Sequence, residues 1–406
     1  MSSSAIIQNK DIIIVGQQPW DVEIGSNCKN IALELSKHNR VLYVNSPLDR
    51  ITLLKHKDSA NVKKRVEVIK GKRNGLVRLQ ENLWNYYPDE IIESVNWIKN
   101  NTAYTLLNKL NNKRFARSIK KAAQQLGFKD FVLFNDNDMF RSFYLKELLK
   151  PTLSIYYSRD FMLAVDYWKL HGTKMEPELI AKSDLCVANS TYLANYCGQY
   201  NPNSFYVGQG CDLDTFTGYN QEQNPPKDIM YIPGPVIGYV GALQNIRLDM
   251  EILRHIAKQR PQWNIVLVGP EDGEFQKSDL HNIHNIHFLG GKNPDLLPAY
   301  ISAFDVCLNP QIVNQVTIGN YPRKIDEYLA MGKPVVATRT EAMSAFADHV
   351  YLGDTKEDYV KLIDQALAEN SEALQQERIR FAGTHTWTNN VDEIYKAIKK
   401  VLPTYA

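Results

Sequence analysis

Short apolar runs alternate with helix-length amphipathic segments along the whole chain. Each run is apolar at consecutive positions, which indicates strands that are covered on both faces, as in a parallel sheet with helices on each side. The predicted strands are 11–16, 40–45, 130–135, 152–158, 184–190 and 204–210, followed by 236–241, 263–269, 286–290, 304–310 and 334–338. The pattern predicts an α/β fold built from doubly wound parallel sheets.

A polar segment containing two prolines, at 219–228, interrupts this rhythm. Because 406 residues exceed what one hydrophobic core usually supports, we expect two domains. The predicted boundaries are 1–218 for an N-terminal domain, 219–235 for a linker, 236–383 for a C-terminal domain and 384–406 for a terminal amphipathic helix, which could cross back to the N-terminal domain. Ligands of such sheets bind beyond the carboxyl ends of the strands, so we expect a cleft between two facing domains.

One predicted helix carries charges that packing does not require. It lies in NYPRKIDEYLAMGKPVVAT at 320–338, where Pro322 suits the first turn and a glycine and a proline end the helix. The apolar side of this helix consists of Ile325, Tyr328 and Leu329. Arg323, Lys324 and Glu327 are left over. A surface ion pair between Arg323 and Glu327 would explain two of them, whereas cations beside a helix N-terminus suit a bound diphosphate.

Charge is balanced over the chain but not along it. With 47 Lys and Arg against 45 Asp and Glu, the net charge of +2 disfavours a dedicated nucleic-acid-binding protein. Between positions 50 and 121, however, there are 17 basic residues and only 6 acidic ones. The aromatic residues Trp84, Tyr86, Tyr87 and Trp97 are interleaved with them. This combination suits an anionic membrane surface, and a solvated helical excursion would explain it as well.

The cysteine pattern and the absence of apolar spans bear on the compartment. Five cysteines without CxxC spacing fit a reducing cytoplasm. The N-terminal segment lacks a basic region before its apolar residues, so we expect no signal peptide, and no run approaches the roughly 18 apolar residues of a membrane span. We expect a cytoplasmic protein, with the inner face of the cytoplasmic membrane as an alternative location.

Several polar residues follow predicted strands in the first half. No GxGxxG or P-loop pattern is present, which disfavours an NAD enzyme or a P-loop kinase. Gly25, Ser26 and Asn27 precede a helix, where they could hold an anion or a sugar hydroxyl, or merely cap the helix. Asp136 and Asp160 would lie in the cleft, although turn chemistry alone would explain them. The histidines at 281, 284 and 287 do not have the spacing of a metal site, and we assign none.

The segment at 320–338 resembles the donor-binding motif of GT-B glycosyltransferases. The resemblance is to the large retaining family that uses nucleotide-diphosphate sugars, the family 4-like group 1 glycosyltransferases, and within it to a branch of the teichuronic-acid type. Further segments agree in order and spacing, namely 183–196, 207–216, 236–270, 285–310 and 385–398. The resemblance implies two Rossmann-like domains that face a central cleft, with the donor bound by the C-terminal domain.

The same resemblance implies roles for single residues. Glu327 matches the second Glu of a paired-Glu motif and would bind the ribose hydroxyls, and Arg247 matches a Lys that faces the donor diphosphate. Gly319 stands where the first Glu is usual, and Ala242 stands where an Arg is expected. Arg323 or Lys324 would then replace the missing cation. The candidate catalytic residues are Arg247, Lys324, Asp160 and Asp136. The candidate donor-binding residues are Glu327, Arg323, Asn320, Tyr321, Gly319, Gly290, Asn309 and Gly241, and the candidate acceptor or phosphate loop is Gly25, Ser26 and Asn27.

The resemblance implies a glycosyltransferase of the hexosyltransferase type. It would transfer a sugar from a UDP- or GDP-sugar to a glycan or lipid-linked acceptor in bacterial cell-surface polysaccharide synthesis. We expect no cofactor and no metal ion, no nucleic-acid partner, and peripheral contact with an anionic membrane. A nucleotide-sugar epimerase of the same fold and a non-catalytic protein that binds sugar nucleotides are the alternatives.

Overall fold

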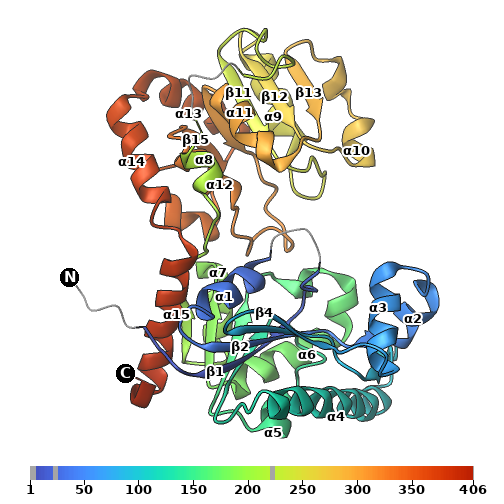
Figure 1. The fold of residues 1–406 in the computed structure, drawn as a ribbon. Coiled ribbons are helices and arrows are strands. Elements are labelled where there is room, and N and C mark those ends of the chain that lie inside the picture. Colours follow the sequence, from blue (N-terminus) through green and yellow to red (C-terminus); the bar gives the residue numbers. More distant parts are fainter. Residues whose placement is uncertain (1–5, 22–25, 220–224, 406) are drawn as a thin grey trace. The chain divides into compact units, whose positions relative to one another are not determined.

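A computed structural model describes residues 6–21, 26–219 and 225–405. The chain divides into two compact units, one formed by Met1–Gly208 with Trp387–Ala406 and the other by Gln209–Thr386. Figure 1 shows the sheet and helices of each unit. Within the described residues, each unit contains one large sheet, and the two sheets share no strand.

The first unit is built on an eight-stranded sheet of order β10-β9-β8-β7-β1-β2-β5-β4. Its strands are β1 (Asp11–Gly16), β2 (Arg40–Asn45), β4 (Leu76–Gln80), β5 (Leu83–Tyr86), β7 (Val132–Asp136), β8 (Leu153–Ser158), β9 (Leu185–Ala188) and β10 (Ser204–Tyr206). All neighbouring strands are parallel except β4, which runs antiparallel to β5 at one edge. A separate parallel pair joins β3 (Leu48–Asp49) to β6 (Ile91–Ile92).

Helices cover both faces of this sheet. The helices of this unit are α1 (Asn27–Leu35), α2 (Arg50–Lys55), α3 (Ala60–Ile69), α4 (Asn101–Gln125), α5 (Leu145–Leu149), α6 (Asp166–Lys182), α7 (Thr191–Gly198) and α15 (Trp387–Val401). Along β1, Ile12 and Ile14 join the core cluster that contains α1 and α15, whereas Ile13 and Val15 join the cluster that contains α4. Successive side chains of a strand point to opposite faces, so the unbroken apolar run follows from a sheet that is covered twice.

The second unit contains a six-stranded, fully parallel sheet of order β13-β12-β11-β14-β15-β16. Its strands are β11 (Val236–Val240), β12 (Asn264–Val268), β13 (Ile286–Gly290), β14 (Val306–Asn309), β15 (Val335–Thr338) and β16 (Tyr351–Gly353). Its helices are α8 (Asp214–Thr217), α9 (Met250–Gln259), α10 (Gly273–Gln276), α11 (Leu297–Ser302), α12 (Lys324–Ala330), α13 (Lys356–Glu369) and α14 (Glu372–Ala382). This strand order is that of a Rossmann sheet, whose order reverses between β11 and β14.

Short 3-10 turns complete the described elements, at Met162–Ala164, Asp279–Asn282, Pro294–Leu296, Ala342–Phe346 and Pro403–Tyr405. Every strand that the apolar pattern predicts is present, several of them shorter at one or both ends. The pattern did not predict β3, β4, β5, β6 and β16. The outward side chains of β4 are largely exposed, and β16 is only three residues long, so neither strand has a continuous apolar run.

The boundaries of the units differ from the predicted ones. Residues 209–218 belong to the second unit, because Cys211, Leu213 and Phe216 enter its core cluster. The described part of the predicted linker also packs there: Ile229 is buried in the same cluster, and the Asp228 carboxylate lies 2.7 Å from the Lys292 ammonium. Residues 220–224 lie outside the described part of the chain. The described residues 225–235 of the predicted linker therefore belong to the second unit.

Candidate functional site

The loops beyond the carboxyl ends of the second sheet are held together by backbone contacts. A parallel bridge pairs Leu243 with Glu271, and an antiparallel bridge pairs Leu248 with Gln311. The amide of Ile312 donates to the carbonyl of Arg247 at 2.9 Å. The backbone of Arg247 is thus fixed, while its side chain is exposed and has no hydrogen bond or ion pair with any described residue. A rigid loop that presents an unpaired cation suits an anionic ligand.

Two glycines allow the loops after β11 and β12 to approach each other. A Cβ atom on Gly269 would lie 1.9 Å from the carbonyl oxygen of Gly241, and the backbone of Gly269 has a φ of +158°. A Cβ atom on Gly241, where φ is +141°, would lie 2.9 Å from the ammonium nitrogen of Lys324. These positions require glycine because the backbone of one loop and the Lys324 side chain occupy the space beside them.

Lys324 lies at the carboxyl end of β11. Its ammonium donates to the hydroxyl of Tyr239 over 2.5 Å and lies 4.2 Å from the centre of the Tyr239 ring. The contact holds the side chain of Lys324, the first residue of α12, beside Gly241. The sequence predicts a catalytic role for Lys324, and in the structure its charge lies at the strand ends, where ligands of this fold bind.

Arg323 is arranged differently from its neighbour. It is the N-cap residue of α12, and its Nε atom is buried without a hydrogen-bond partner among the described residues. No ion pair joins Arg323 to Glu327 in the described structure. The surface ion pair that would have explained these two charges is therefore not formed, and both groups retain hydrogen-bonding capacity.

Glu327 is a half-buried carboxylate on α12. Burial raises the pKa of Glu327, the charges of Arg323 and Lys324 oppose that rise, and the charge of Asp326 adds to it. No described residue donates a hydrogen bond to the Glu327 carboxylate. A carboxylate whose acceptor positions are unused can receive both hydroxyls of a diol.

Asp326 is a charged group that sequence reasoning did not identify. It is fully buried and accepts hydrogen bonds from three side chains: His385 Nδ1 at 2.5 Å, the Tyr321 hydroxyl at 2.8 Å and Cys211 Sγ at 3.2 Å. These contacts tie the start of α12 to two distant parts of the second unit. Tyr321, a predicted donor-binding residue, is therefore also a structural contact of Asp326. An acid between apolar helix positions was the signal available in the sequence.

Two other predicted donor-binding residues lie at the carboxyl ends of strands of the second sheet, and two lie in the loop before α12. Asn309 ends β14 and is buried, and its Nδ2 atom has no hydrogen-bond partner among the described residues. Gly290 ends β13 with a φ of +72° and open space around it. Gly319 and Asn320 lie in the loop that leads to α12, where the Asn320 amide donates to the carbonyl of Thr317.

In the first unit, the two predicted carboxylates share one guanidinium. Arg159 Nε lies 2.7 Å from the fully buried Asp136, and Arg159 Nη1 lies 2.5 Å from Asp160, whose side chain is 45% exposed. Burial disfavours the charged form of Arg159, but the carboxylates outweigh it and raise the pKa of Arg159. Asp136 also accepts from the Gln17 amide. The sequence missed Arg159, whose only signal was its position directly after a strand.

The turn and helix near these carboxylates also bear on the predicted site. Asp138 caps a turn and pairs with Arg141 at 2.8 Å, as turn chemistry would have it. Ser26 is the N-cap residue of α1 but makes no side-chain capping hydrogen bond, and its buried Oγ has no partner among the described residues. Asn27 Nδ2 lies 3.5 Å from the Tyr157 hydroxyl. Gly25 lies outside the described residues.

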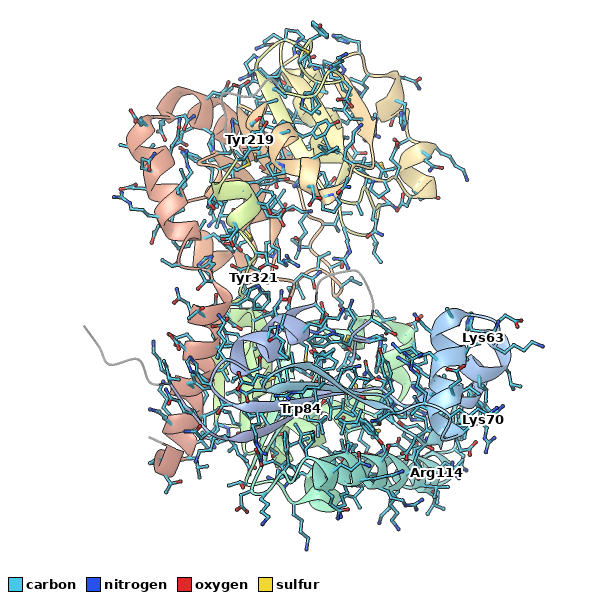
Figure 2. The ribbon with its side chains drawn as sticks, in the orientation of Figure 1. Lys63, Lys70, Trp84, Arg114, Tyr219 and Tyr321 are labelled. Atoms are coloured by element: carbon cyan, nitrogen blue, oxygen red, sulfur yellow. The ribbon has the colours of Figure 1, made fainter. Side chains whose placement is uncertain are left out.

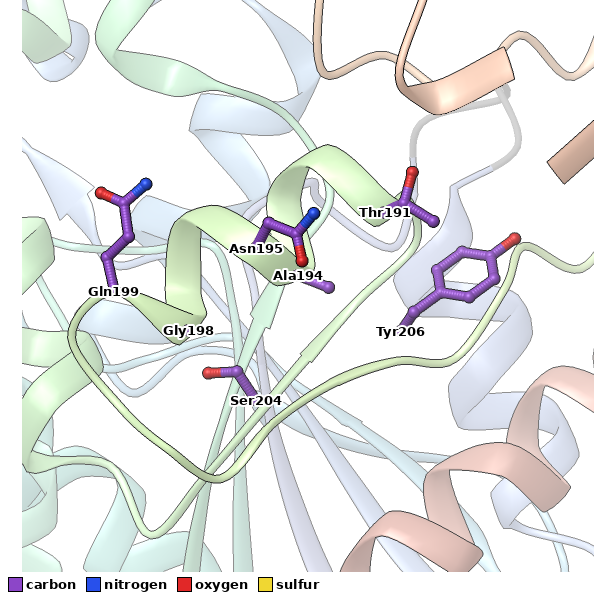
Figure 3. Close-up of a pocket in the computed structure, with 7 residues that line it drawn as sticks. All are labelled: Thr191, Ala194, Asn195, Gly198, Gln199, Ser204 and Tyr206. Atoms are coloured by element: carbon purple, nitrogen blue, oxygen red, sulfur yellow. The ribbon is translucent and has the colours of Figure 1, made fainter. Parts of the chain in front are cut away.

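A polar hollow of about 500 Å³ lies elsewhere in the first unit, between α7 and β10 (Figure 3). It is lined by Thr191, Ala194, Asn195, Gly198, Gln199, Ser204 and Tyr206. None of the predicted site residues lines it.

Across the described ranges, no three His, Cys, Asp or Glu side chains gather in a way that could hold a metal ion. In the same ranges, no helix has the length and apolar character that a membrane crossing requires.

The second unit matches a family model. Residues 234–377 match the model described as "Glycosyl transferases group 1". TuaH of Bacillus subtilis (strain 168), named as a candidate glycosyltransferase of teichuronic acid biosynthesis, is 27% identical over 198 residues. That match covers 47% of this chain and 49% of TuaH, so it spans about half the length of each protein.

Solved structures resemble the chain over nearly its whole length. An α,α-trehalose-phosphate synthase (UDP-forming) of Burkholderia vietnamiensis has a TM-score of 0.67 at 11% identity, covering 97% of this chain and 100% of that one. Anabaena Alr3699/HepE, solved in complex with UDP, has a TM-score of 0.63 at 14% identity, covering 96% and 100%. At these identities the likeness shows the fold. Residues 234–377 are therefore similar to the glycosyl transferases group 1 family, and the two Rossmann-like units of the chain have the GT-B fold.

Proposed function

We propose that the protein transfers a glycosyl group from a UDP- or GDP-sugar to a glycan or lipid-linked acceptor in bacterial cell-surface polysaccharide synthesis. The observation that carries the proposal is the position of Lys324, whose ammonium lies against Tyr239 and Gly241 at the carboxyl end of β11 in a group 1 domain. HepE, which shares the fold, has been solved with UDP and with UDP-glucose. The name of TuaH refers to teichuronic acid biosynthesis, which supports a cell-surface polysaccharide as the product.

The donor site follows from the charges of the second unit. The nucleotide diphosphate would lie at the strand ends, between the exposed cation of Arg247 and the ammonium of Lys324. Glu327 would accept the hydroxyls of the ribose. As the bond between the anomeric carbon and the β-phosphate oxygen breaks, negative charge grows on that oxygen, and fixed cations stabilise it. In this proposal the chain's own cations, without a resident metal ion, perform that stabilisation.

The acceptor side of the reaction is assigned to the first unit. The acceptor oxygen forms the new bond to the anomeric carbon and gives up its proton. Asp160 is the better candidate to take up this proton, because its carboxylate is partly exposed, whereas Asp136 is fully buried against Arg159. Ser26 and Asn27, at the start of α1, would contact a hydroxyl or phosphate of the acceptor.

An acceptor that carries a lipid would place the protein at a membrane. We therefore propose a cytoplasmic location at the inner face of the cytoplasmic membrane, which the net excess of basic residues between positions 50 and 121 supports.

Incubation of the purified protein with a panel of UDP- and GDP-sugars, in buffer containing a chelator, tests the proposal. A transferase releases UDP or GDP in proportion to glycosylated acceptor, with membrane extract or undecaprenyl-linked saccharide as acceptor. An epimerase converts the donor without any acceptor, and a non-catalytic binding protein binds the donor in calorimetry without changing it. Either of these results would replace the proposal with the corresponding alternative.

A further inference from the structure

Large apolar side chains are exposed on four segments of the first unit. The exposed fractions are 41% for Ile51 and 74% for Leu54 on α2, 69% for Trp97, 65% for Leu106 on α4, and 59% for Tyr167 and 49% for Leu170 on α6. A scattered exposed Leu needs no explanation, but several large apolar side chains together mark an interaction surface.

The segments that carry these side chains meet at residues 94–98. The amide of Ile51 donates to Ser94 Oγ at 3.0 Å, and Trp97 Nε1 donates to the Ser94 carbonyl at 2.8 Å, so α2 and Trp97 share one anchor. Tyr104 of α4 stacks on His171 of α6 with 3.5 Å between ring centres, in the same core cluster that receives Ile98. Leu106 lies on the outer side of α4, away from the buried Tyr104, and Leu170 precedes His171 on α6. The exposed residues therefore lie on segments that meet at one corner of the unit, which we name the 94–98 corner.

Polar contacts hold the helix α2 at this corner. None of its residues is buried. Asp49 caps it by accepting from the Thr52 amide, and Arg50 pairs with Glu93 at 2.5 Å. Glu93 also pairs with Arg114 of α4. Leu54, at 74% exposure, therefore contributes little to packing within the unit, and Ile51 is also exposed.

Cations surround the corner. The helix α4 contains six Lys and Arg residues and no acidic residue. Exposed lysines without an ion-pair partner in the described structure include Lys55, Lys57, Lys63, Lys99 and Lys113. The exposed acids nearby are Asp58, Asp166 and Glu67, and Glu67 lies 4.0 Å from the Arg73 guanidinium. Lys63 and Lys70 project from α3, and Arg114 lies on α4 (Figure 2). The uncompensated charge is therefore positive.

The structure also corrects the set of residues that the sequence predicted for a membrane-binding surface. Of the four interleaved aromatic residues, Tyr86 and Tyr87 are buried and Trp84 is half-buried in the sheet, which leaves only Trp97 exposed. Arg117 and Lys121 pair with Glu90 and Asp89. The tertiary structure thus moves the available surface from the whole basic region to one corner.

We propose that the 94–98 corner docks the protein onto an anionic phospholipid bilayer, with Leu54, Trp97 and Leu106 entering the headgroup region. A bilayer fits better than a protein partner, because protein interfaces are depleted in Lys, whereas Trp and Lys together are typical of membrane surfaces. The inference deepens the proposed function, since it names the surface that would bring the enzyme to a lipid-linked acceptor. It can be tested without any transfer reaction.

Flotation of the full chain with vesicles tests the proposal. Vesicles with about 30 mol% phosphatidylglycerol should bind the protein at low salt, and pure phosphatidylcholine vesicles should not. Each lost lysine should weaken binding about 5-fold, so Lys55→Glu with Lys57→Glu should weaken it about 25-fold or more. Replacing Leu54, Trp97 and Leu106 by Ala should weaken it at least about 30-fold even where charge is unchanged.

Matched variants in the second unit provide the control. Tyr231, Val313 and Leu296 are 81%, 52% and 50% exposed, and replacing all three by Ala should leave vesicle binding unchanged. Lys277→Glu with Lys356→Glu changes the net charge as much as Lys55→Glu with Lys57→Glu does, but it should weaken vesicle binding less. Bromine-labelled lipid should quench tryptophan emission in the native chain, and Trp97→Phe should lose most of that quenching.

Three results would overturn the proposal: equal binding to neutral and anionic vesicles, equal loss in both sets of variants, or quenching that survives Trp97→Phe. If the chain instead forms a dimer that the Leu54, Trp97 and Leu106 replacements dissociate, and no vesicles bind, then a second copy occupies the corner. Because vesicle binding requires no donor or acceptor, an inactive enzyme that still binds vesicles would contradict only the proposed function.

Discussion

Replacing Lys324 by Met tests the donor site most directly. The change removes the ammonium that lies 2.5 Å from the Tyr239 hydroxyl and beside Gly241, while the volume of the side chain is nearly kept. The cation should act mainly on the leaving diphosphate, whose charge grows as the glycosidic bond breaks, so kcat should fall more than donor affinity. Loss of one preorganised contact of this kind typically lowers the rate about 100- to 1000-fold.

The expected loss corresponds to about 2.7–4 kcal/mol of transition-state stabilisation. The cost to folding should be smaller, about 1 kcal/mol, since only the hydrogen bond to Tyr239 disappears and the tyrosine hydroxyl stays close to the Ala242 carbonyl. The assay is steady-state release of UDP or GDP with saturating acceptor, combined with calorimetric titration of the nucleotide and with thermal unfolding.

Two further variants make the result specific. Lys333 is also partly buried in the second unit, but it donates to the carbonyls of Ser302 and Phe304. Lys333→Met should therefore lower stability without the loss of kcat. Arg247→Ala should show the same kinetic loss as Lys324→Met, and the double variant should lose less than the product, because both cations act on one group. A Lys324→Met enzyme with near wild-type kcat would refute the reasoning and leave Arg323 as the cation.

The other predictions concern carboxylates. Glu327→Ala should weaken nucleotide binding by about 2–4 kcal/mol in calorimetry, because two charge-assisted hydrogen bonds to the ribose are lost, and unchanged affinity would contradict the ribose assignment. Burial raises the pKa of Glu176 to about 7, although the hydrogen bond from Tyr156 acts to lower it. The folded state therefore binds the proton of this carboxyl more tightly than the unfolded state. Stability should then fall by up to about 3 kcal/mol as the pH rises from about 4.5 to 7, and Glu176→Gln should remove this dependence in urea unfolding curves recorded across that range. Asp136→Asn should cost about 3 kcal/mol in the same measurement, since Arg159 loses its buried partner, and a loss below about 1 kcal/mol would contradict that role.

The sequence by itself determined the architecture. Runs such as Ile12 to Val15 are apolar at every position, and only a sheet with both faces covered buries all of them, so the strands and their parallel arrangement could be predicted. The motif at 320–338 likewise placed Lys324 and Glu327 on one helix, since neighbours in sequence are neighbours in space over a helical turn.

Only the tertiary structure decided which charged groups are engaged. The partners of Asp136 and Asp326 lie far away in the chain, 23 residues on at Arg159 and 59 residues on at His385, and no local pattern specifies such a contact. The same holds for the basic region, where folding buries Tyr86 and Tyr87 and leaves Trp97 and Leu54 exposed. Local propensity acts over a few residues, whereas burial and ion pairing depend on which distant segments the sheet order brings together. For that reason the sequence predicted most of the strands and the helix that carries Lys324 and Glu327, but not Arg159, Asp326 or the 94–98 corner.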